Sequence, residues 1–300
     1  MNDRTKLEVK RKDLDFNHIY LAMETLRLTL DWTPNTNHSG FYVGLHEGWY
    51  FEAGINLEIL YPSEDYTLKE TPARRVVNGV ADLCIAPSES VISCWTSEPY
   101  KTRPVAVAAV LQDDTSAIVS LKSGPVQKLS DLDDHRYASY GGRFEMNIVK
   151  QAVQNDGGKG NVIELVPPKL DCFDHVLRGD SEATWVFTAW EGLMATKKGI
   201  LLNEFPLKNS RVPYGYSPSL LAHPSLVTEK SDLLRRFLKV TARGYQYCVT
   251  NPHEAAAMLL KTANHPTLDV LGLSFLEESQ ALLARGDHIL TKSGTWGEMR

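Results

Sequence analysis

Long hydrophobic runs are missing from this chain of 300 residues. A helix that crosses a bilayer needs about 20 consecutive apolar residues, and no stretch approaches that length. The N-terminal segment also lacks the apolar core of a signal peptide, because Asp3, Glu8, Asp13 and Asp15 interrupt it. As written, the chain is therefore expected to be cytoplasmic, without membrane insertion. A periplasmic or cell-surface location would require a leader that has been removed.

Paired cysteines and clustered basic residues are also scarce. Cys84, Cys94, Cys172 and Cys248 stand apart, without a C-x-x-C pair or a nearby His at metal-ligand spacing. They indicate neither a metal site nor a disulfide framework. The net charge is -5, and the one dense basic run is 10–12. No nucleic-acid partner is expected, because a phosphate-binding surface needs clustered Lys and Arg.

The composition, 43% hydrophobic and 23% charged, is that of an ordinary globular protein. Short apolar runs alternate with longer helical patterns, which is typical of βαβ units and a largely parallel sheet. The expected strands are 26–30, 57–60, 82–85, 105–111, 117–121, 137–139, 163–166, 184–187 and 219–222. The expected helices are 40–52, 72–78, 88–96, 144–154, 173–177, 189–198, 231–249 and 252–262.

No Pro- or Ser-rich linker cuts the chain into sequential domains. This continuity predicts two lobes joined by segments that cross between them. The first lobe is expected to comprise 26–112 and 217–300, the second 113–216, and residues 1–25 an N-terminal extension. The expected crossings are 112–116 and 214–218. The chain stops after Arg300 without a helix terminator, so it is expected to continue or to be completed by another element.

An unusual group of polar and aromatic residues follows the first expected strand. Trp32 offers a stacking face, Asn35 and Asn37 offer amides, and His38 offers an imidazole. Ligands of open α/β sheets collect beyond the carboxyl ends of strands. A flat heterocycle with exocyclic amines needs aromatic area and amides that read its edge. We favour such a site over the alternative, a turn shaped by Asn and Pro with Trp32 in the core.

This segment also carries a resemblance. The sequence W-T-P-N-T-N-H-S-G-F-Y-V-G, starting at Trp32, resembles the opening motif of formylaminopyrimidine-binding proteins. They belong to a family shared with sulfonate-binding proteins and yeast-type thiamine pyrimidine synthases. The likeness continues through H-E-G-W-Y-F-E-A-G-I-N-L-E-I and covers nearly all of 26–300. It implies the α/β fold of periplasmic-binding-protein type II, two lobes with a ligand cleft between them, and an aminopyrimidine ligand related to thiamine precursors.

Within this family, the synthases are expected to carry a Lys that holds pyridoxal phosphate and, four residues later, a His that is consumed. Aligned on Gly79–Asp82, those positions fall on Ala86 and Ser90. Neither residue can form a Schiff base or supply an imidazole nitrogen. The resemblance therefore favours a binding protein without a cofactor. Pyridoxal phosphate belongs only to the alternative, a synthase-like enzyme of thiamine-pyrimidine formation.

Further candidates lie at other strand-to-helix junctions. Ser88 and Glu89 open a helix, where they could contact a ligand or simply act as an N-cap and a first-turn acid. Tyr140, Gly141 and Glu145 belong to a Gly-Gly loop that the fold is expected to place opposite Trp32. A plain tight turn is an equally good interpretation of that loop.

Two aromatic segments complete the expected site. Trp190 and Glu191 follow a strand, and a carboxylate beside an aromatic ring suits an amine-bearing pyrimidine. Trp185, inside the strand, is expected to be core. The resemblance implies a Tyr where this chain has Thr188, which removes a stacking partner. Tyr214 lies at the second crossing, where it could swing onto a ligand or merely shape the crossover.

Together these arguments predict binding residues but no catalytic residue and no metal ligand. The predicted ligand-binding residues are Trp32, Asn35, Asn37, His38, Ser88, Glu89, Thr115, Tyr140, Gly141, Glu145, Trp190, Glu191 and Tyr214. The expected partner is a small aminopyrimidine, bound for uptake, salvage or sensing. An ABC-transporter permease is a further partner if the chain is exported. A scaffold or sensory domain of a larger protein is the weaker third hypothesis.

Overall fold

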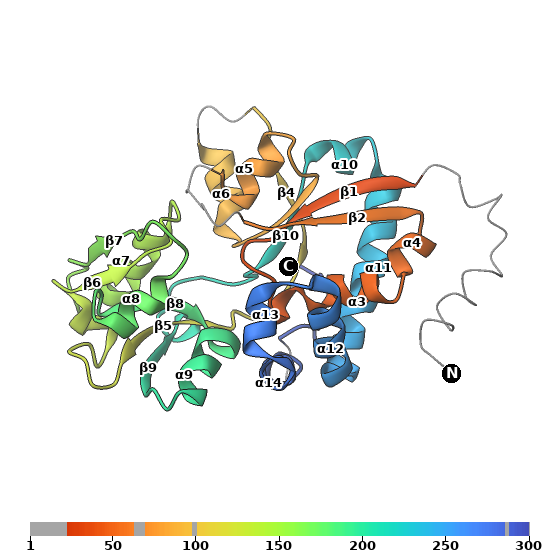
Figure 1. The fold of residues 1–300 in the computed structure, drawn as a ribbon. Helices are drawn as coiled ribbons and strands as arrows, with labels where there is room; N and C mark the ends of the chain where they lie inside the picture. Colours follow the sequence, from red (N-terminus) through yellow and green to blue (C-terminus); the bar gives the residue numbers. More distant parts are fainter. Residues whose placement is uncertain (1–22, 63–69, 98–100, 286–287, 300) are drawn as a thin grey trace.

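The computed structural model describes residues 23–62, 70–97, 101–285 and 288–299. It contains two mixed five-stranded sheets, which form the cores of two lobes (Figure 1). This is the two-lobed α/β architecture that the sequence predicts. Among the described residues, no helix combines the length and hydrophobicity needed to cross a bilayer.

The first lobe is built on a sheet with the order β2-β1-β3-β10-β4. Its strands are β1 (Glu24–Thr29), β2 (Ile55–Leu60), β3 (Leu83–Ala86), β4 (Val105–Ala109) and β10 (Ser219–Ala222). β1 is parallel to β2 and β3, whereas β10 is antiparallel to β3 and β4. Leu26 and Leu28 of β1 alternate with more exposed residues and enter the core, as expected for side chains on one face of a strand.

The second lobe repeats this plan with the order β7-β6-β8-β5-β9. Its strands are β5 (Ser116–Leu121), β6 (Arg136–Ala138), β7 (Ile163–Leu165), β8 (Ala183–Phe187) and β9 (Leu202–Pro206). Its helices are α7 (Glu145–Asn155), α8 (Cys172–Arg178) and α9 (Leu193–Lys197). A π-helical turn, η4 (Thr188–Gly192), joins β8 to α9, and the short 3-10 helices are η3 (Leu129–Leu132) and η5 (Leu207–Asn209).

Most of the helices cover the first lobe (Figure 1). They are α3 (Ser39–His46), α4 (Trp49–Glu52), α5 (Pro72–Val77), α6 (Glu89–Thr96), α10 (Pro224–Thr228), α11 (Ser231–Thr250), α12 (Pro252–Ala263), α13 (Pro266–Leu271) and α14 (Leu273–Leu283). α3 crosses α11 very closely: a Cβ added at Gly244 would lie 2.0 Å from the carbonyl oxygen of Gly40. A glycine is needed there, and the contact fixes the segment that leads into α3.

The chain crosses between the sheets twice, from β4 to β5 and back from β9 to β10. Both crossings run beside the region where the lobes meet. The boundaries proposed at 112/113 and 216/217 stay a prediction. Near the end of the chain, Trp296 is buried, stacks on Tyr245 with ring centroids 4.9 Å apart, and donates to the Val110 carbonyl.

Several element predictions were wrong in detail. β9 was missed, because its sequence L-N-E-F-P contains no β-branched residue and shows weak alternation. The single helix expected over 40–52 is divided at Gly48, whose φ of 75° ends helical geometry. No helix was expected beyond Thr262, but α13 and α14 lie there. The four cysteines are buried and unbonded, as expected for ordinary thiols.

Candidate functional site

A cavity of about 400 Å³ lies where the two lobes meet. Its walls come from segments that follow β1 and β3 in the first lobe and β6 and β8 in the second, together with the start of α5 and the second crossing. These are the carboxyl ends of strands, where open α/β sheets leave space for a ligand. The cavity therefore occupies the place that the topology predicts.

The first-lobe turn, residues 31–38, is held by its own buried imidazole. The Asn35 amide N–H donates to Nδ1 of His38 at 3.2 Å, and Nε2 of His38 lies 2.8 Å from Oδ1 of Asp31. Because Nδ1 accepts a backbone hydrogen bond, Nε2 must carry the proton that is shared with Asp31. His38 has no exposed surface, whereas Asp31 and Trp32 line the cavity. The imidazole thus positions the residues that face the cavity.

The Asn35 side chain also belongs to this turn, and it reaches the cavity. Its oxygen accepts the Asn37 amide N–H at 2.9 Å and its nitrogen donates to the Thr33 carbonyl at 3.1 Å. A carboxamide has two acceptor positions and two hydrogens, so these bonds leave one of each for a ligand. Asn35 can therefore read a ring edge while it caps the 3-10 helix η1 (Thr36–His38).

In the second lobe, the loop 139–145 is organised around Glu145. The Tyr137 and Ser139 hydroxyls and the Tyr140 and Gly142 amides donate to its carboxylate at 3.0–3.1 Å. Burial raises the pKa of Glu145, and these hydrogen bonds oppose that shift. Glu145 is thus occupied by its own loop, and it serves to hold Tyr140 at the cleft.

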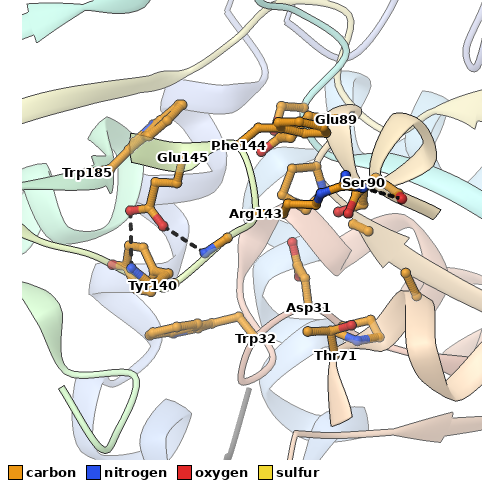
Figure 2. A pocket seen from close by; sticks show the side chains of 18 of the residues that line it. Asp31, Trp32, Thr71, Glu89, Ser90, Tyr140, Arg143, Phe144, Glu145 and Trp185 are labelled. Carbon is orange, nitrogen blue, oxygen red and sulfur yellow. Dashed lines mark hydrogen bonds between the residues drawn. The ribbon is translucent and has the colours of Figure 1, made fainter. Parts of the chain in front are cut away.

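Trp32 and Tyr140 meet edge to face across the cleft, with ring centroids 5.6 Å apart and an interplanar angle of 84° (Figure 2). They come from different lobes, so their contact depends on how the lobes are placed. Both rings also line a second hollow of about 450 Å³, between α8 and α13, together with Glu191. The aromatic pair consequently forms a partition at one end of the main cavity.

Glu191 lies in the π-helical turn after β8, with its side chain at the cavity wall. Its Oε2 accepts the Phe187 amide N–H at 3.1 Å. Burial raises the pKa of Glu191 to about 7. A carboxyl group with that pKa can share a proton with a ring nitrogen and accept from an exocyclic amine. Trp190, its neighbour, packs edge to face on Phe275 of α14 and ties this turn to the first lobe.

A second carboxylate, Glu89, faces the cavity from the first turn of α6. Burial raises the pKa of Glu89 to about 7. Trp185 and Tyr214 lie on the same side of the cavity, with ring centroids 5.0 Å apart. The Trp185 indole N–H donates to the Ser116 hydroxyl at 2.6 Å, which fixes that ring.

Most of the predicted binding residues line the cavity. These are Trp32, Asn35, Glu89, Tyr140, Gly141, Glu145, Trp190, Glu191 and Tyr214. Their contact with a ligand stays a prediction.

The other predicted binding residues, Asn37, His38, Ser88 and Thr115, are not among the residues that line the cavity. Their contact with a ligand likewise stays a prediction. Asn37 and His38 are buried within the first-lobe turn. The Ser88 hydroxyl donates to the Gly215 carbonyl at 2.8 Å and makes no capping hydrogen bond to α6. Thr115 is buried at the first crossing, where its carbonyl accepts from the Thr188 hydroxyl. The Ser88 side chain is therefore engaged within the protein, whereas the buried Thr115 hydroxyl has no hydrogen-bond partner among the described residues.

The sequence interpretation missed several residues of the wall. Trp185 was expected to be core, but it is half-buried and lines the cavity. Strand alternation offered a signal, because Phe187, two residues later, lies on the same face and also lines the cavity. Asp31, Ser90, Arg143 and Phe144 line it as well. Their neighbours had been singled out, but which residues of each loop face the ligand depends on turn geometry.

Neither a metal nor pyridoxal phosphate fits the described part of this site. Among the described residues, no group of His, Cys, Asp and Glu is placed to hold a metal ion. Ala86 and Ser90 both line the cavity. An imine with pyridoxal phosphate would need a lysine amine at the first position, and the synthase pattern would need a histidine at the second. The described lining residues include no lysine. The wall offers carboxylates, an amide, aromatic faces and the guanidinium groups of Arg74 and Arg143 for recognition of a ligand.

Two α/β lobes with these sheet orders, joined by two crossings and with a cavity at their junction, have the periplasmic-binding-protein type II architecture. The sequence matches the family model described as "NMT1/THI5 like" over residues 35–255, and the chain belongs to this family. It is 24% identical over 266 residues to the formylaminopyrimidine-binding protein of Halalkalibacterium halodurans, covering 87% of this chain and 77% of that protein.

The chain is also similar to an enzyme and to a sulphonate-binding protein. The chain is 21% identical over 246 residues to the 4-amino-5-hydroxymethyl-2-methylpyrimidine phosphate synthase of Legionella pneumophila, covering 80% of this chain and 75% of that protein. The periplasmic aliphatic sulphonate binding protein SsuA of Escherichia coli superposes with a TM-score of 0.63 at 14% identity, covering 88% and 84% of the two chains. The latter likeness shows the fold alone.

Proposed function

We propose that the cavity binds a small aminopyrimidine of the thiamine-precursor type. The observation that carries this proposal is the buried Glu191 carboxylate, placed at a cavity that Trp32 and Asn35 also line. An aminopyrimidine presents a ring nitrogen and an exocyclic amine side by side, which a carboxylate recognises with paired hydrogen bonds. Its flat ring takes aromatic contacts, and the Asn35 amide can read another edge.

The two curated relatives support this ligand class. One is named for binding a formylaminopyrimidine and the other for making a hydroxymethylpyrimidine phosphate. Both names contain the same kind of ring, although one protein is a binder and the other an enzyme. For this chain we propose a role in uptake, salvage or sensing. Similar structures include a ligand-binding component of an ABC-type import system, so an ABC-transporter permease is the proposed partner of an exported form.

The decisive experiment is calorimetric titration of the purified protein with formylaminopyrimidine and hydroxymethylpyrimidine, with riboflavin as a control compound. One of the pyrimidines should bind, and riboflavin should not. Glu191→Gln should weaken that binding by about a hundredfold, since a charge-assisted pair of hydrogen bonds contributes about 1.5–3 kcal/mol. Indifference of the wild-type protein to both pyrimidines would rule out the proposed ligand class.

The second candidate, favoured by the synthase relative, is an enzyme of thiamine-pyrimidine formation. Incubation with pyridoxal phosphate followed by borohydride distinguishes the two. The binding hypothesis expects no imine absorbance and no trapped lysine, because Ala86 stands at the position aligned with the cofactor lysine. Trapping on any single lysine would favour the enzyme.

A further inference from the structure

The cavity has a second carboxylate, and the proposed aminopyrimidine ring needs only one. Glu191 lies after β8, whereas Glu89 lies in the first turn of α6, in the other lobe. Figure 2 shows Glu89 and Trp185 in the upper part of the view and Trp32 in the lower part. A ligand whose ring is held by Glu191 and Trp32 would thus have a separate group to place at Glu89.

The surroundings of Glu89 leave its charge incompletely compensated. Its Oε2 atom is buried and has no hydrogen-bond partner among the described residues. Hydrogen bonding from its own backbone N–H and from the Tyr214 hydroxyl favours the ionised form of Glu89, but burial outweighs both, and the Tyr214 hydroxyl also donates to the Ser217 hydroxyl at 2.9 Å. The other charged groups that act on Glu89 are Glu145 and Asp114, and both disfavour its ionisation. A buried carboxylate oxygen without a donor is costly, so this position favours an added donor or cation.

Glu145, at the same cavity, is a carboxylate whose oxygens are satisfied by donors within the protein. Its oxygens accept hydrogen bonds from Tyr137, Ser139, Tyr140 and Gly142. Glu89 has no comparable set of donors among the described residues. The contrast indicates that the free oxygen of Glu89 is available to a ligand.

Two arginines line the cavity, Arg74 and Arg143, and the hydrogen bonds of Arg143 are made away from Glu89. Nη1 of Arg143 donates to the Ser93 carbonyl and the Thr96 hydroxyl, both at 2.9 Å, and also to Ser97. These acceptors lie at the C-terminal end of α6, where a guanidinium is favoured by the helix dipole and by unpaired carbonyls. Glu89 lies at the opposite end of that helix. Arg143 therefore joins the lobes without satisfying Glu89.

Aromatic rings add to the preference for a cation at this end. Trp185 and Tyr214 pack against each other at 5.0 Å, and both line the cavity together with Glu89. Ring faces attract ammonium groups through their quadrupoles, most strongly where water is excluded. A carboxylate with two aromatic rings is thus a setting for a positively charged nitrogen.

We propose that Glu89, Trp185 and Tyr214 form a second subsite that takes a cationic group of the ligand. On this inference, which rests on the proposed function, the ligand is an aminopyrimidine whose ring substituent ends in a primary ammonium group. Glu191 reads the ring, and Glu89 pairs with the ammonium group. Glu89 is then a residue that determines specificity between charged and neutral substituents.

The test compares four pyrimidines that differ only in the substituent: aminomethyl, formylaminomethyl, hydroxymethyl and the phosphate ester of the last. Calorimetry at pH 7.5 should show the aminomethyl compound binding at least about tenfold more tightly than either neutral one, as expected for an added charge-assisted contact. Glu89→Gln should abolish this preference, so that the ratio of the two affinities falls to about one. Glu89→Asp should restore part of the preference, and Glu229→Gln, an exposed charge change in the same lobe, should leave it intact.

A second measurement, the pH dependence of binding, can be made on the wild-type protein and does not depend on whether a variant folds. Since burial raises the pKa of Glu89 to about 7, the ionised fraction grows between pH 6 and pH 8. The affinity ratio of the aminomethyl to the formylaminomethyl compound should rise about tenfold over that range. Taking the ratio cancels changes at Glu191, which meets the same ring in both compounds. Glu89→Gln should give a flat ratio.

Three outcomes would overturn the inference. The neutral compounds could bind as tightly as the aminomethyl compound, the phosphate ester could bind best, or Glu89→Gln could retain the preference. In each case a pyrimidine still binds, and the proposed function survives. If none of the four compounds binds, the proposed function is wrong, and so is this inference, which rests on it. The two failures are therefore distinguishable.

Discussion

Two loops face each other across the cavity, 31–38 from the first lobe and 139–145 from the second, and they use similar means. Each holds an aromatic ring at the cleft, Trp32 in one and Tyr140 in the other, by means of a buried ionisable side chain bonded to its own backbone. They differ in whether that side chain also contacts a residue that faces the cavity. His38 is joined to Asp31, which faces the cavity, whereas Glu145 is fully occupied within its loop.

This difference separates two kinds of carboxylate at one cavity. Glu145 is saturated by hydrogen bonds that organise the loop, so its loss should be felt mainly in stability. Glu89 and Glu191 make fewer contacts within the protein, and their burial raises the pKa of each to about 7. Such groups cost the empty protein stability and are suited to a ligand that compensates them. The comparison can be tested at each carboxylate.

The largest effect of a single substitution is expected at Glu145. Glu145→Ala should lower the free energy of unfolding by about 4 kcal/mol, because it leaves several buried donors without an acceptor. Urea unfolding followed by circular dichroism measures this change, with Glu204→Ala as an exposed control in the same lobe. A loss below about 1 kcal/mol would show that the loop does not depend on this carboxylate.

The next effect concerns pH and the other two carboxylates. An unfolded Glu has a pKa of 4.5, and the folded values for Glu89 and Glu191 are about 7. The folded state therefore holds these protons more tightly, so the contribution of the two groups to stability is greatest below pH 4.5 and falls as pH rises towards 7. Each group accounts for a decrease on the order of 3 kcal/mol at most.

This pH dependence is measured by urea unfolding of the ligand-free protein between pH 5 and pH 7.5. The double variant Glu89→Gln, Glu191→Gln should lose most of the decline, because neither amide titrates. Other groups titrate in both proteins, so the difference between the two curves isolates the pair. A wild-type stability that rises over this range relative to the variant would contradict the assignment.

The smallest effect is expected at His38. His38→Ala should cost about 2 kcal/mol of stability, because the Asn35 amide and the Asp31 carboxylate each lose a partner. Trp32 and Asp31 would then be less well held, so the affinity for the pyrimidine should fall by roughly tenfold. Thermal unfolding and titration measure the two changes, with exposed His253→Ala as the control. An unchanged affinity would mean that the turn keeps its shape without the imidazole.

The sequence by itself determined the two-lobed fold and the strand ends at which the cavity forms. Alternation of strands and helices, with polar and aromatic residues after β1, β3, β6 and β8, was enough, because parallel strands bring their carboxyl ends together. Trp32 and Glu191 could be proposed as wall residues on those grounds. Short elements such as β9 were not predicted, because five residues are too few to show a clear hydrophobic alternation.

Only the tertiary structure decided which side chains of each loop face the cavity. His38 turned inwards because a backbone N–H and Asp31 occupy its ring nitrogens, a pairing that no spacing rule specifies. Trp185 faces the cavity because its neighbours in space, Ser116 and Tyr214, lie far from it in sequence. Whether a buried carboxylate is satisfied, as Glu145 is, or left with a free oxygen, as Glu89 is, depends on donors supplied by the folded backbone.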